Sequence, residues 1–384
     1  MIYLDNAATT WPKPECVYAA VDYCLRNIAA NPGRGGHRMA REAGLLLFET
    51  RELLAQLLGV EDPNRICFTY NATDSLNIAL LGLLKEGDVV LTTSLEHNAV
   101  ARPLRWLERN RGIRLKIIGG DDQGRLRLDV LQKELEQGAA AVVMTHASNV
   151  TGALMPVAEV GRLTRRQGTQ LIVDAAQTAG VEPIDVEAMG IDVLAFSGHK
   201  GLLGPQGTGG IYVREGLVIQ PLRTGGTGSL SESDRQPDFM PDSLESGTPN
   251  TPGIAGLRAA LQYIHEQGRE VLQERERLLA RQLINGFAEI PGVRLLGPAA
   301  EEERTAVVSV TVRNWDSGAL ARELDEQYGI ACRGGLHCAP WAHEAMGTLK
   351  TGAVRFSPGA FTSTEEIEQA VRAMEKLCEK GQSL

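Results

Sequence analysis

Short apolar runs and amphipathic segments alternate through the first half of the chain. The apolar runs are typical of buried strands and fall at residues 65–70, 88–92, 115–118, 139–145, 170–174 and 193–196. In other segments apolar residues recur every three or four positions, which predicts helices near residues 14–27, 39–58, 76–84 and 157–167, with another opening at 96–98. Continuous apolar strands between amphipathic helices indicate an α/β fold with a mainly parallel sheet covered on both faces.

The last third of the chain has a different pattern. One long helical run, about residues 254–287, precedes strands near 293–296, 306–312 and 354–356 and helices near 318–328 and 364–378. Ser363 and Glu366 form a capping box for the last helix. We therefore expect a large domain at residues 15–253 and a smaller α+β domain at 254–384, with residues 1–14 packing near the smaller one.

Composition narrows the class of protein. The chain has 384 residues, of which 43% are hydrophobic and 23% charged, as in ordinary globular enzymes. A net charge of −9 argues against nucleic acid or an anionic membrane as a partner. Six irregularly spaced cysteines do not predict a disulfide framework, and neither a signal peptide nor a membrane-spanning run is visible. We expect a cytoplasmic location.

Chemically active side chains follow several of the expected strands. His97, Asn149, Asp174 and Lys200 each lie at or just after the end of a strand. Ligands of parallel sheets bind beyond the carboxyl ends of the strands, so these side chains are expected to share one site. Lys200 stands in a glycine-containing turn, where burial would lower its pKa and free its amine for imine chemistry; the alternative is a solvated turn lysine.

Two further features allow either a ligand or an ordinary structural role. Residues 71–75 form a small, polar turn between a strand and a helix, which is an arrangement that binds phosphate. The alternative is a helix capped by Thr73 without a ligand. Asp174 ends a buried strand, where a carboxylate needs a cationic partner such as a pyridinium nitrogen. It could equally be a helix cap or a buried, hydrogen-bonded acid.

Seven segments taken in order form a more specific pattern. They are Leu4–Thr10, Asn31–Gly35, Glu96–Asn98, Val173–Gln177, Ser197–Lys200, Gly247–Pro252 and Arg333–Cys338. Together they resemble the fold-type I, class V aminotransferase-like enzymes that use pyridoxal phosphate, and among these the cysteine desulfurase and selenocysteine lyase family. The resemblance covers essentially the whole chain. It implies pyridoxal 5′-phosphate as cofactor and a large domain with a mainly parallel, seven-stranded sheet, followed by a smaller α+β domain.

The resemblance also implies roles around the cofactor ring. Lys200 would form an imine with the cofactor aldehyde, and Asp174 would pair with the pyridine nitrogen. Gln177 would donate a hydrogen bond to the ring hydroxyl, while His97 would stack on the ring face. Asn149 would lie beside the ring and the substrate.

The phosphate and the partner subunit are assigned in the same way. The resemblance implies that Thr73, Ser197 and His199 bind the cofactor phosphate, and that Ala72 also belongs to the cofactor-binding residues. Thr251 would reach the phosphate of a neighbouring subunit's cofactor, so the family pattern implies a homodimer.

On the substrate side the resemblance implies that Arg355 binds the substrate carboxylate, with Arg333, Ala8 and Asn149 nearby. A guanidinium suits a carboxylate because it donates two parallel hydrogen bonds. Without the resemblance, a surface ion pair would be the expected role of Arg355.

Cys338 distinguishes between the reactions of this family. It lies close in sequence to Arg333, His337 and His343, and a thiolate near cationic groups is activated. Two other interpretations are a small buried side chain and a metal site with the two histidines, which would have too few ligands. The resemblance favours a catalytic thiol, and we expect no metal.

The other cysteines are interpreted as structural, and they are Cys16, Cys24, Cys67, Cys332 and Cys378. The chain also departs from its relatives at three places. Leu336 and Gly33 stand where relatives often have histidine, and Arg355 is followed by Phe-Ser-Pro instead of small residues. These differences concern substrate preference and the sulfur acceptor.

The predicted activity is conversion of L-cysteine to L-alanine with a persulfide on Cys338, for transfer to an acceptor protein as in iron–sulfur cluster assembly. L-Selenocysteine is an alternative substrate. Transamination or another β-elimination, with Cys338 incidental, is an alternative reaction. A non-enzymatic alternative is a sulfur-relay or regulatory partner with little turnover.

Overall fold

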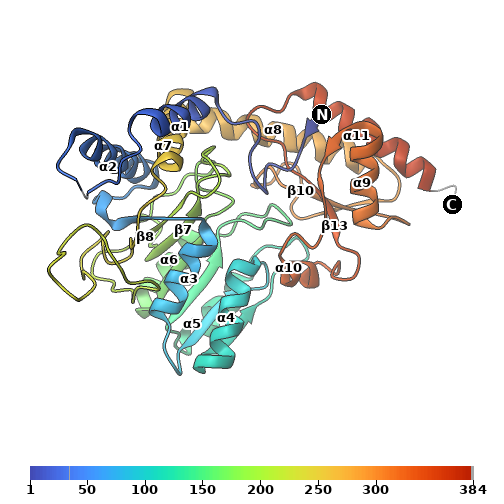
Figure 1. Ribbon diagram of the computed structural model, residues 1–384. Helices are drawn as coiled ribbons and strands as arrows, with labels where there is room; N and C mark the ends of the chain where they lie inside the picture. The colour runs from blue at the N-terminus through green and yellow to red at the C-terminus, as the bar shows by residue number, and fades with distance from the viewer. Residues whose placement is uncertain (34, 382–384) are drawn as a thin grey trace.

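The computed structural model describes residues 1–33 and 35–381 (Figure 1). Arg34, which belongs to the family-like segment Asn31–Gly35, lies outside the described residues, as do residues 382–384. Two separate sheets, one of seven strands and one of four, organise the described part of the chain.

The larger sheet confirms the expected α/β architecture. Its strands, in spatial order, are β2 (Ile66–Thr69), β8 (Gly209–Val213), β7 (Val193–Ser197), β6 (Gln170–Asp174), β5 (Ala141–Thr145), β3 (Val89–Thr93) and β4 (Arg114–Ile118). Only β8 runs against its neighbours, since it pairs antiparallel with β2 and β7 while the other pairs are parallel. The carboxyl ends of the other strands therefore meet along one edge.

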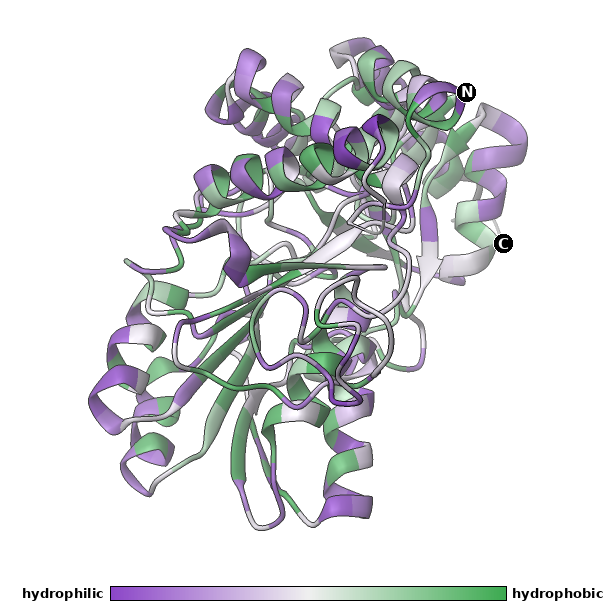
Figure 2. Ribbon diagram, turned by 60° about the vertical axis from the view of Figure 1, so that its left-hand side comes forward, coloured by the Kyte–Doolittle hydropathy of each residue, from purple (hydrophilic) through white to green (hydrophobic). Residues whose placement is uncertain are grey.

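Successive side chains of a strand point to opposite sides of a sheet. Here the side chains on both faces are covered by helices. On β6, Leu171 and Val173 belong to one hydrophobic cluster and Ile172 to another. The first cluster includes side chains of α5 (Leu128–Glu136) and α6 (Val157–Gln167), and the second those of α3 (Ala72–Leu83) and α4 (Asn98–Arg111). Figure 2 shows the hydrophobic strands between helices whose outer faces are hydrophilic.

The first helices of the chain pack beside this layer. α1 (Glu15–Asn27) and α2 (Arg38–Leu58) both contact α7 (Thr251–Gln267). Leu46 and Leu47 of α2 share a buried cluster with Ile254 and Ala255 of α7. The start of α7, which carries Thr251, is therefore fixed against the N-terminal helices.

The smaller sheet has a core of its own. Its order is β12 (Arg333–Gly335), β13 (Ala353–Phe356), β10 (Val308–Val312) and β9 (Val293–Leu296), and all pairs are antiparallel. It packs with α8 (Arg269–Ala288), α9 (Ser317–Tyr328) and α11 (Thr364–Gly381), while α10 (Pro340–Ala345) lies between β12 and β13 in the chain. The first strand, β1 (Ile2–Tyr3), pairs parallel with β11 (Ile330–Ala331). The N-terminal segment thus begins on the C-terminal part of the chain.

Some elements differ from the sequence expectation. The single helix expected at 254–287 is two helices, because Gly268 adopts a φ of 82° between α7 and α8. The helix expected from residue 76 starts at Ala72, and Asn71 rather than Thr73 caps it by accepting a hydrogen bond from the Asp74 amide. Strand β8 completes the seven strands that the resemblance implies, but the apolar pattern did not predict its position.

The capping box of the last helix is confirmed. The Ser363 amide donates to the Glu366 carboxylate over 2.9 Å, and the Glu366 amide donates to the Ser363 hydroxyl over 3.2 Å. Within residues 1–33 and 35–381, none of the helices combines the length and the apolar character that crossing a membrane requires.

Candidate active site

A cavity of about 220 Å³ lies at the carboxyl edge of the larger sheet. It is lined by Asn71, Ala72, Thr73, His97, Ala99, Thr145, Ala147, Asn149, Asp174, Ala176, Gln177, Ser197, His199 and Lys200. Every residue predicted to bind the cofactor is present except Thr251. The parallel topology explains this convergence, because these segments follow β2, β3, β5, β6 and β7.

Lys200 lies in a turn to which the N-terminal segment is hydrogen-bonded. The His199 carbonyl accepts hydrogen bonds from the Thr10 amide over 3.1 Å and from Lys13 Nζ over 2.8 Å. Gly198 cannot be larger, since a Cβ there would lie 2.2 Å from the Thr208 hydroxyl. Burial lowers the pKa of Lys200 to about 8, and the charge of a neighbouring carboxylate opposes this shift only in part.

That carboxylate belongs to Asp174, which is 4% exposed at the end of β6. Its Oδ1 accepts a hydrogen bond from the Ala176 amide over 2.9 Å. Burial raises the pKa of Asp174, while this amide and the Lys200 charge lower it. A buried carboxylate with so little hydrogen bonding calls for a cationic group in the cavity.

Glu96 lies nearby and is completely buried. Its Oε1 accepts hydrogen bonds from the Thr93 hydroxyl over 2.5 Å and from the Thr145 amide over 3.0 Å. Burial raises the pKa of Glu96 to about 8, with the Asp174 charge contributing, so the carboxyl is neutral at pH 7. The sequence indicated Glu96 only as part of a motif; its role here is to join the loop before His97 to the end of β5.

His97 caps α4 with its ring. Its Nδ1 accepts a hydrogen bond from the Ala99 amide over 3.0 Å, so the proton of the neutral ring is on Nε2. Burial lowers the pKa of His97 to about 4, and the nearby Lys200 charge adds to this. A neutral, fixed imidazole at the cavity wall can stack on an aromatic ring.

The part of the cavity at the start of α3 fits an anion. Helix α3 begins there, and its first amide, from Ala72, donates to the Ser197 hydroxyl over 3.0 Å. Thr73 follows in the first turn, where the helix dipole is positive. His199 Nδ1 lies 3.1 Å from the Thr9 hydroxyl, which fixes its ring.

Gln177 and Asn149 line the cavity and are also tied to distant segments. Gln177 Nε2 donates to the Ala7 carbonyl over 3.1 Å. Asn149 Nδ2 donates to the His337 carbonyl over 2.8 Å. These contacts join the cavity to the N-terminal segment and to the loop that carries Cys338.

The loop of Cys338 has an unusual backbone. His337 and Cys338 have φ values of 50° and 56°, in the left-handed region that side chains rarely adopt. The Cys338 carbonyl accepts a hydrogen bond from the Asn98 amide over 2.7 Å, beside His97. Arg333 Nη2 lies 3.5 Å from Cys338 Sγ, and Cys338 is exposed. The contacts therefore hold an accessible thiol next to a guanidinium and beside His97 of the cavity wall, although Cys338 is not among the described residues that line the cavity itself.

The two histidines of this loop are hydrogen-bonded to each other and to neighbouring residues. His337 Nδ1 lies 3.1 Å from His343 Nε2, His337 Nε2 lies 2.9 Å from the Arg333 carbonyl, and His343 Nδ1 lies 2.8 Å from the Thr348 hydroxyl. All four ring nitrogens thus have partners. Among the residues that the structure describes, no group of three or more His, Cys, Asp or Glu side chains is arranged to hold a metal ion.

Arg355 is 1% exposed and is not the surface ion pair that the sequence alone favoured. Its Nη2 bonds Asp5 Oδ1 over 2.8 Å, and its Nη1 donates to the Asn149 carbonyl over 3.2 Å. Its Nε is buried and has no hydrogen-bond partner within residues 1–33 and 35–381. Arg333 lies directly opposite Arg355 on the neighbouring strand β12, so two guanidinium-bearing side chains leave the same face of this sheet. An additional anion would satisfy both.

Asp5 was missed in the sequence, although it belongs to the motif Leu4–Thr10. Its partner Arg355 is 350 positions away along the chain, so no local pattern could indicate the pair. Ala8, which the sequence assigned to the substrate, is not among the cavity-lining residues and follows Ala7, the partner of Gln177.

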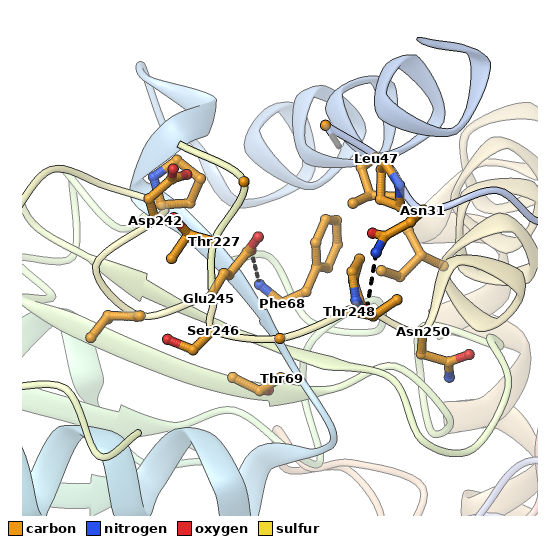
Figure 3. A pocket seen from close by; sticks show the side chains of 18 of the residues that line it. Asn31, Leu47, Phe68, Thr69, Thr227, Asp242, Glu245, Ser246, Thr248 and Asn250 are labelled. Atoms are coloured by element: carbon orange, nitrogen blue, oxygen red, sulfur yellow. Dashed lines mark hydrogen bonds between the residues drawn. The ribbon is translucent and has the colours of Figure 1, made fainter. Parts of the chain in front are cut away.

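Thr251 also lies away from the cavity, buried at the start of α7. Beside it is a second hollow of about 340 Å³, where Asn31 donates to Thr248 and the Phe68 amide donates to Glu245 (Figure 3). Arg51 pairs with the same Glu245 over 2.5 Å. These contacts fix the loop that precedes Thr251.

The residues of the cavity fit pyridoxal phosphate. Lys200 offers an amine, Asp174 a buried carboxylate for a pyridinium nitrogen, and His97 a flat neutral ring. The start of α3 offers N–H and hydroxyl groups to a phosphate. Each of these groups therefore has a matching group on that cofactor.

Comparisons with known proteins agree with this chemistry. The family model described as aminotransferase class-V matches residues 2–370. A probable cysteine desulfurase of Pyrococcus abyssi is 35% identical, over 98% of this chain and 94% of its own length. A cysteine desulfurase of Haloferax volcanii is 30% identical, over 98% of this chain and 89% of its own length.

Two solved structures are similar throughout. The apo cysteine desulfurase of Thermococcus onnurineus NA1 superposes with a TM-score of 0.93 at 35% identity, covering 99% of this chain and 95% of that one. The cysteine desulfurase CsdA of Escherichia coli, in an S-sulfonic acid form, gives 0.87 at 28% identity, covering 98% and 94%.

Proposed function

The chain belongs to the class V aminotransferase family and, within it, to the cysteine desulfurases, and on that premise we propose that it uses pyridoxal 5′-phosphate and makes its persulfide on Cys338. The overall reaction converts L-cysteine and the Cys338 thiol to L-alanine and a Cys338 persulfide. The observation that carries the assignment of Cys338 is its position, exposed, 3.5 Å from Arg333 and tied by its carbonyl to the residue after His97.

The chain's own residues would hold the cofactor as follows. Lys200 would bind its aldehyde, Asp174 its ring nitrogen and His97 its face, while Thr73, Ser197 and His199 would bind its phosphate. Bound in this way, pyridoxal phosphate supplies an electron sink for the substrate's α-carbon. The neutral Glu96 supports this arrangement, because it leaves Asp174 as the carboxylate available to a cationic ring.

Arg355 and Arg333 would orient the substrate by its carboxylate. Asp5 already neutralises one guanidinium, and the unpartnered Nε of Arg355 is available for a further acceptor. A bidentate contact there fixes both the position and the rotation of an amino acid. Asn149 ties this contact to the Cys338 loop, since it bonds both Arg355 and His337.

Proton and sulfur transfer would then use Lys200 and Cys338. The Lys200 amine, released when the substrate's own amine takes its place, would accept the α-proton, and a pKa of about 8 suits a base that works near neutral pH. The Cys338 thiolate attacks the substrate sulfur, and the bond between that sulfur and the β-carbon breaks. The carbon product is protonated to alanine, so the atoms of cysteine are fully accounted for.

Single-turnover analysis of two variants tests this function. Cys338→Ala should retain the absorbance of bound cofactor and form no persulfide from L-cysteine, whereas the control Cys332→Ala should form it on Cys338. Lys200→Ala should lose the protein-bound absorbance that borohydride fixes. Undiminished sulfur release by Cys338→Ala would contradict the assignment. Assaying L-selenocysteine in parallel ranks the two substrates.

We also propose a homodimer in which Thr251 reaches the phosphate of the partner's cofactor, and two domains at residues 15–253 and 254–384. Support comes from the position of Thr251 outside the described residues that line its own cavity and from the separate cores of the two sheets, although Leu257 and Leu261 of α7 belong to the core of the larger sheet. The mass of the protein in solution tests the dimer. A mixture of Thr251→Ala and Lys200→Ala chains tests whether Thr251 acts across the interface.

A further inference from the structure

A groove of about 560 Å³ extends outward from the active-site cavity between α3 and α4. It is lined by Thr73, Asn77, Leu81, His97, Asn98, Ala99, Arg102, Pro103, Trp106 and Cys338. Thr73, His97 and Ala99 also line the cavity, so the groove and the cavity adjoin and share these residues as a common wall. Cys338 belongs to the groove, which means that the groove leads to the residue proposed to carry the sulfur.

The groove has a defined direction and length. Thr73, Asn77 and Leu81 are four residues apart and form one stripe along α3. The rise from Thr73 to Leu81 is about 12 Å at 1.5 Å per residue. An extended polypeptide of roughly four residues spans the same distance at about 3.3 Å per residue. The groove is therefore long enough for a short extended segment lying along the helices.

Its floor is apolar and ends at an aromatic side chain. Leu81, Ala99 and Pro103 lie along it, and Trp106 is 49% exposed at the end away from His97. A large aromatic side chain at the edge of an apolar groove is typical of sites that anchor a partner's side chain.

The groove is also cationic on a chain whose net charge is −9. None of the described residues that line it is acidic, and Arg102 is part of its wall. Arg333 is 3.5 Å from Cys338 Sγ at one end. At the other end Arg111 donates to the Leu81 carbonyl over 2.6 Å and lies 5.8 Å from the Trp106 ring. Positive charge thus occurs at both ends and in the middle, and it complements an acidic ligand.

We propose that this groove binds an extended, acidic segment of a sulfur-acceptor protein and presents its cysteine to Cys338. The inference rests on the proposed function and specifies the partner of the same site. The acceptor thiolate attacks the outer sulfur of the Cys338 persulfide, the sulfur–sulfur bond breaks, and Cys338 leaves as a thiolate. The acceptor then carries the persulfide, and no external oxidant or reductant is needed.

Persulfide-loaded enzyme and two synthetic nonapeptides test the inference. Each peptide has one central cysteine with a neighbouring leucine, flanked either by aspartates or by lysines, and mass analysis follows sulfur transfer. We expect the acidic peptide to react about tenfold faster than the basic one, as electrostatic complementarity predicts. Arg102→Glu should remove or reverse this preference, and Trp106→Ala should slow transfer to both peptides by about fivefold or more.

Matched controls lie on other helices. Arg166→Glu on α6 and Leu278→Ala on α8 change comparable exposed side chains outside the groove and should transfer sulfur like the unaltered protein. Release of sulfide by dithiothreitol should be equal in all variants, because this small thiol needs no groove.

Equal rates with the two peptides, or rates unaffected by both groove substitutions, would overturn the inference while leaving the proposed function intact. So would a raised KM for L-cysteine in the groove variants with unchanged peptide transfer, since the groove would then be the access path of the substrate. An enzyme that forms no persulfide on Cys338 would overturn the proposed function and this inference together.

Discussion

Replacing Glu96 with glutamine should stabilise the cofactor-free protein at neutral and alkaline pH. Glutamine has the shape of a protonated glutamate, and its Oε1 can accept the same bonds from Thr93 and Thr145. The native state keeps the Glu96 proton up to a pKa of about 8, whereas the unfolded chain releases it near 4.5. Between these values the native state binds more protons, so the free energy of unfolding falls as pH rises.

The size of the effect follows from the shift in pKa. Each unit corresponds to about 1.4 kcal/mol, so the change from 4.5 to about 8 corresponds to roughly 5 kcal/mol in full. At pH 7 the pH lies about 2.5 units above the pKa of the unfolded chain, so Glu96 lowers the free energy of unfolding by roughly 3 kcal/mol. At pH 5 the two proteins should differ by less than about 1 kcal/mol.

Urea unfolding at pH 5, 7 and 8.5, followed by circular dichroism, measures this difference. Glu61→Gln is the matched control, because Glu61 is exposed and its substitution should change stability little at any of the three pH values. A Glu96→Gln protein that differs from the unaltered one by the same amount at all three pH values would refute the reasoning, since the effect would then not involve the proton.

Three other predictions can be checked on the same protein. Asp5→Asn should destabilise the protein by about 3 kcal/mol in urea unfolding, because it leaves the buried Arg355 without a counter-charge; an unchanged midpoint would contradict the pairing. Gly161→Ala should cost about 1–3 kcal/mol in the same assay, since its Cβ would lie 1.9 Å from the Met189 carbonyl oxygen. The rate at which Lys200 takes up pyridoxal phosphate should rise with pH through its pKa of about 8 and then level off, followed by absorbance; a flat profile would exclude a titrating amine.

Much of the site could be predicted because its residues follow from the direction of the strands. Asp174 and Lys200 are separated by 26 positions in the sequence. Asp174 nevertheless ends β6, and Lys200 lies in the turn that follows β7, the parallel neighbour of β6. Once the apolar runs had been recognised as parallel strands, their convergence at one edge was a consequence of topology.

Other features had no local signal. Strand β8 begins with Gly209 and Gly210, which weaken a strand pattern, but their lack of side chains is required by close contacts with Asn71 and Phe196. Thr73 was the alternative cap that the sequence allowed for α3, but Asn71 provides the cap, because both residue types are good caps and the backbone decides between them.

Charge balance links the buried acids and bases to the chemistry of the substrate. Around the cofactor-free cavity, Lys200, Arg333 and Arg355 are cationic at pH 7, and Asp5 and Asp174 are the carboxylates paired with them or near them. The neutral glutamic acid and the neutral imidazole beside them add no charge. These five described side chains therefore carry one positive charge in excess, and Asp5 is paired with Arg355 and not with Arg333. An amino acid carboxylate supplies the missing charge where its sulfur can approach the nearby thiol, so the same electrostatic imbalance that disfavours the empty site favours binding of the substrate.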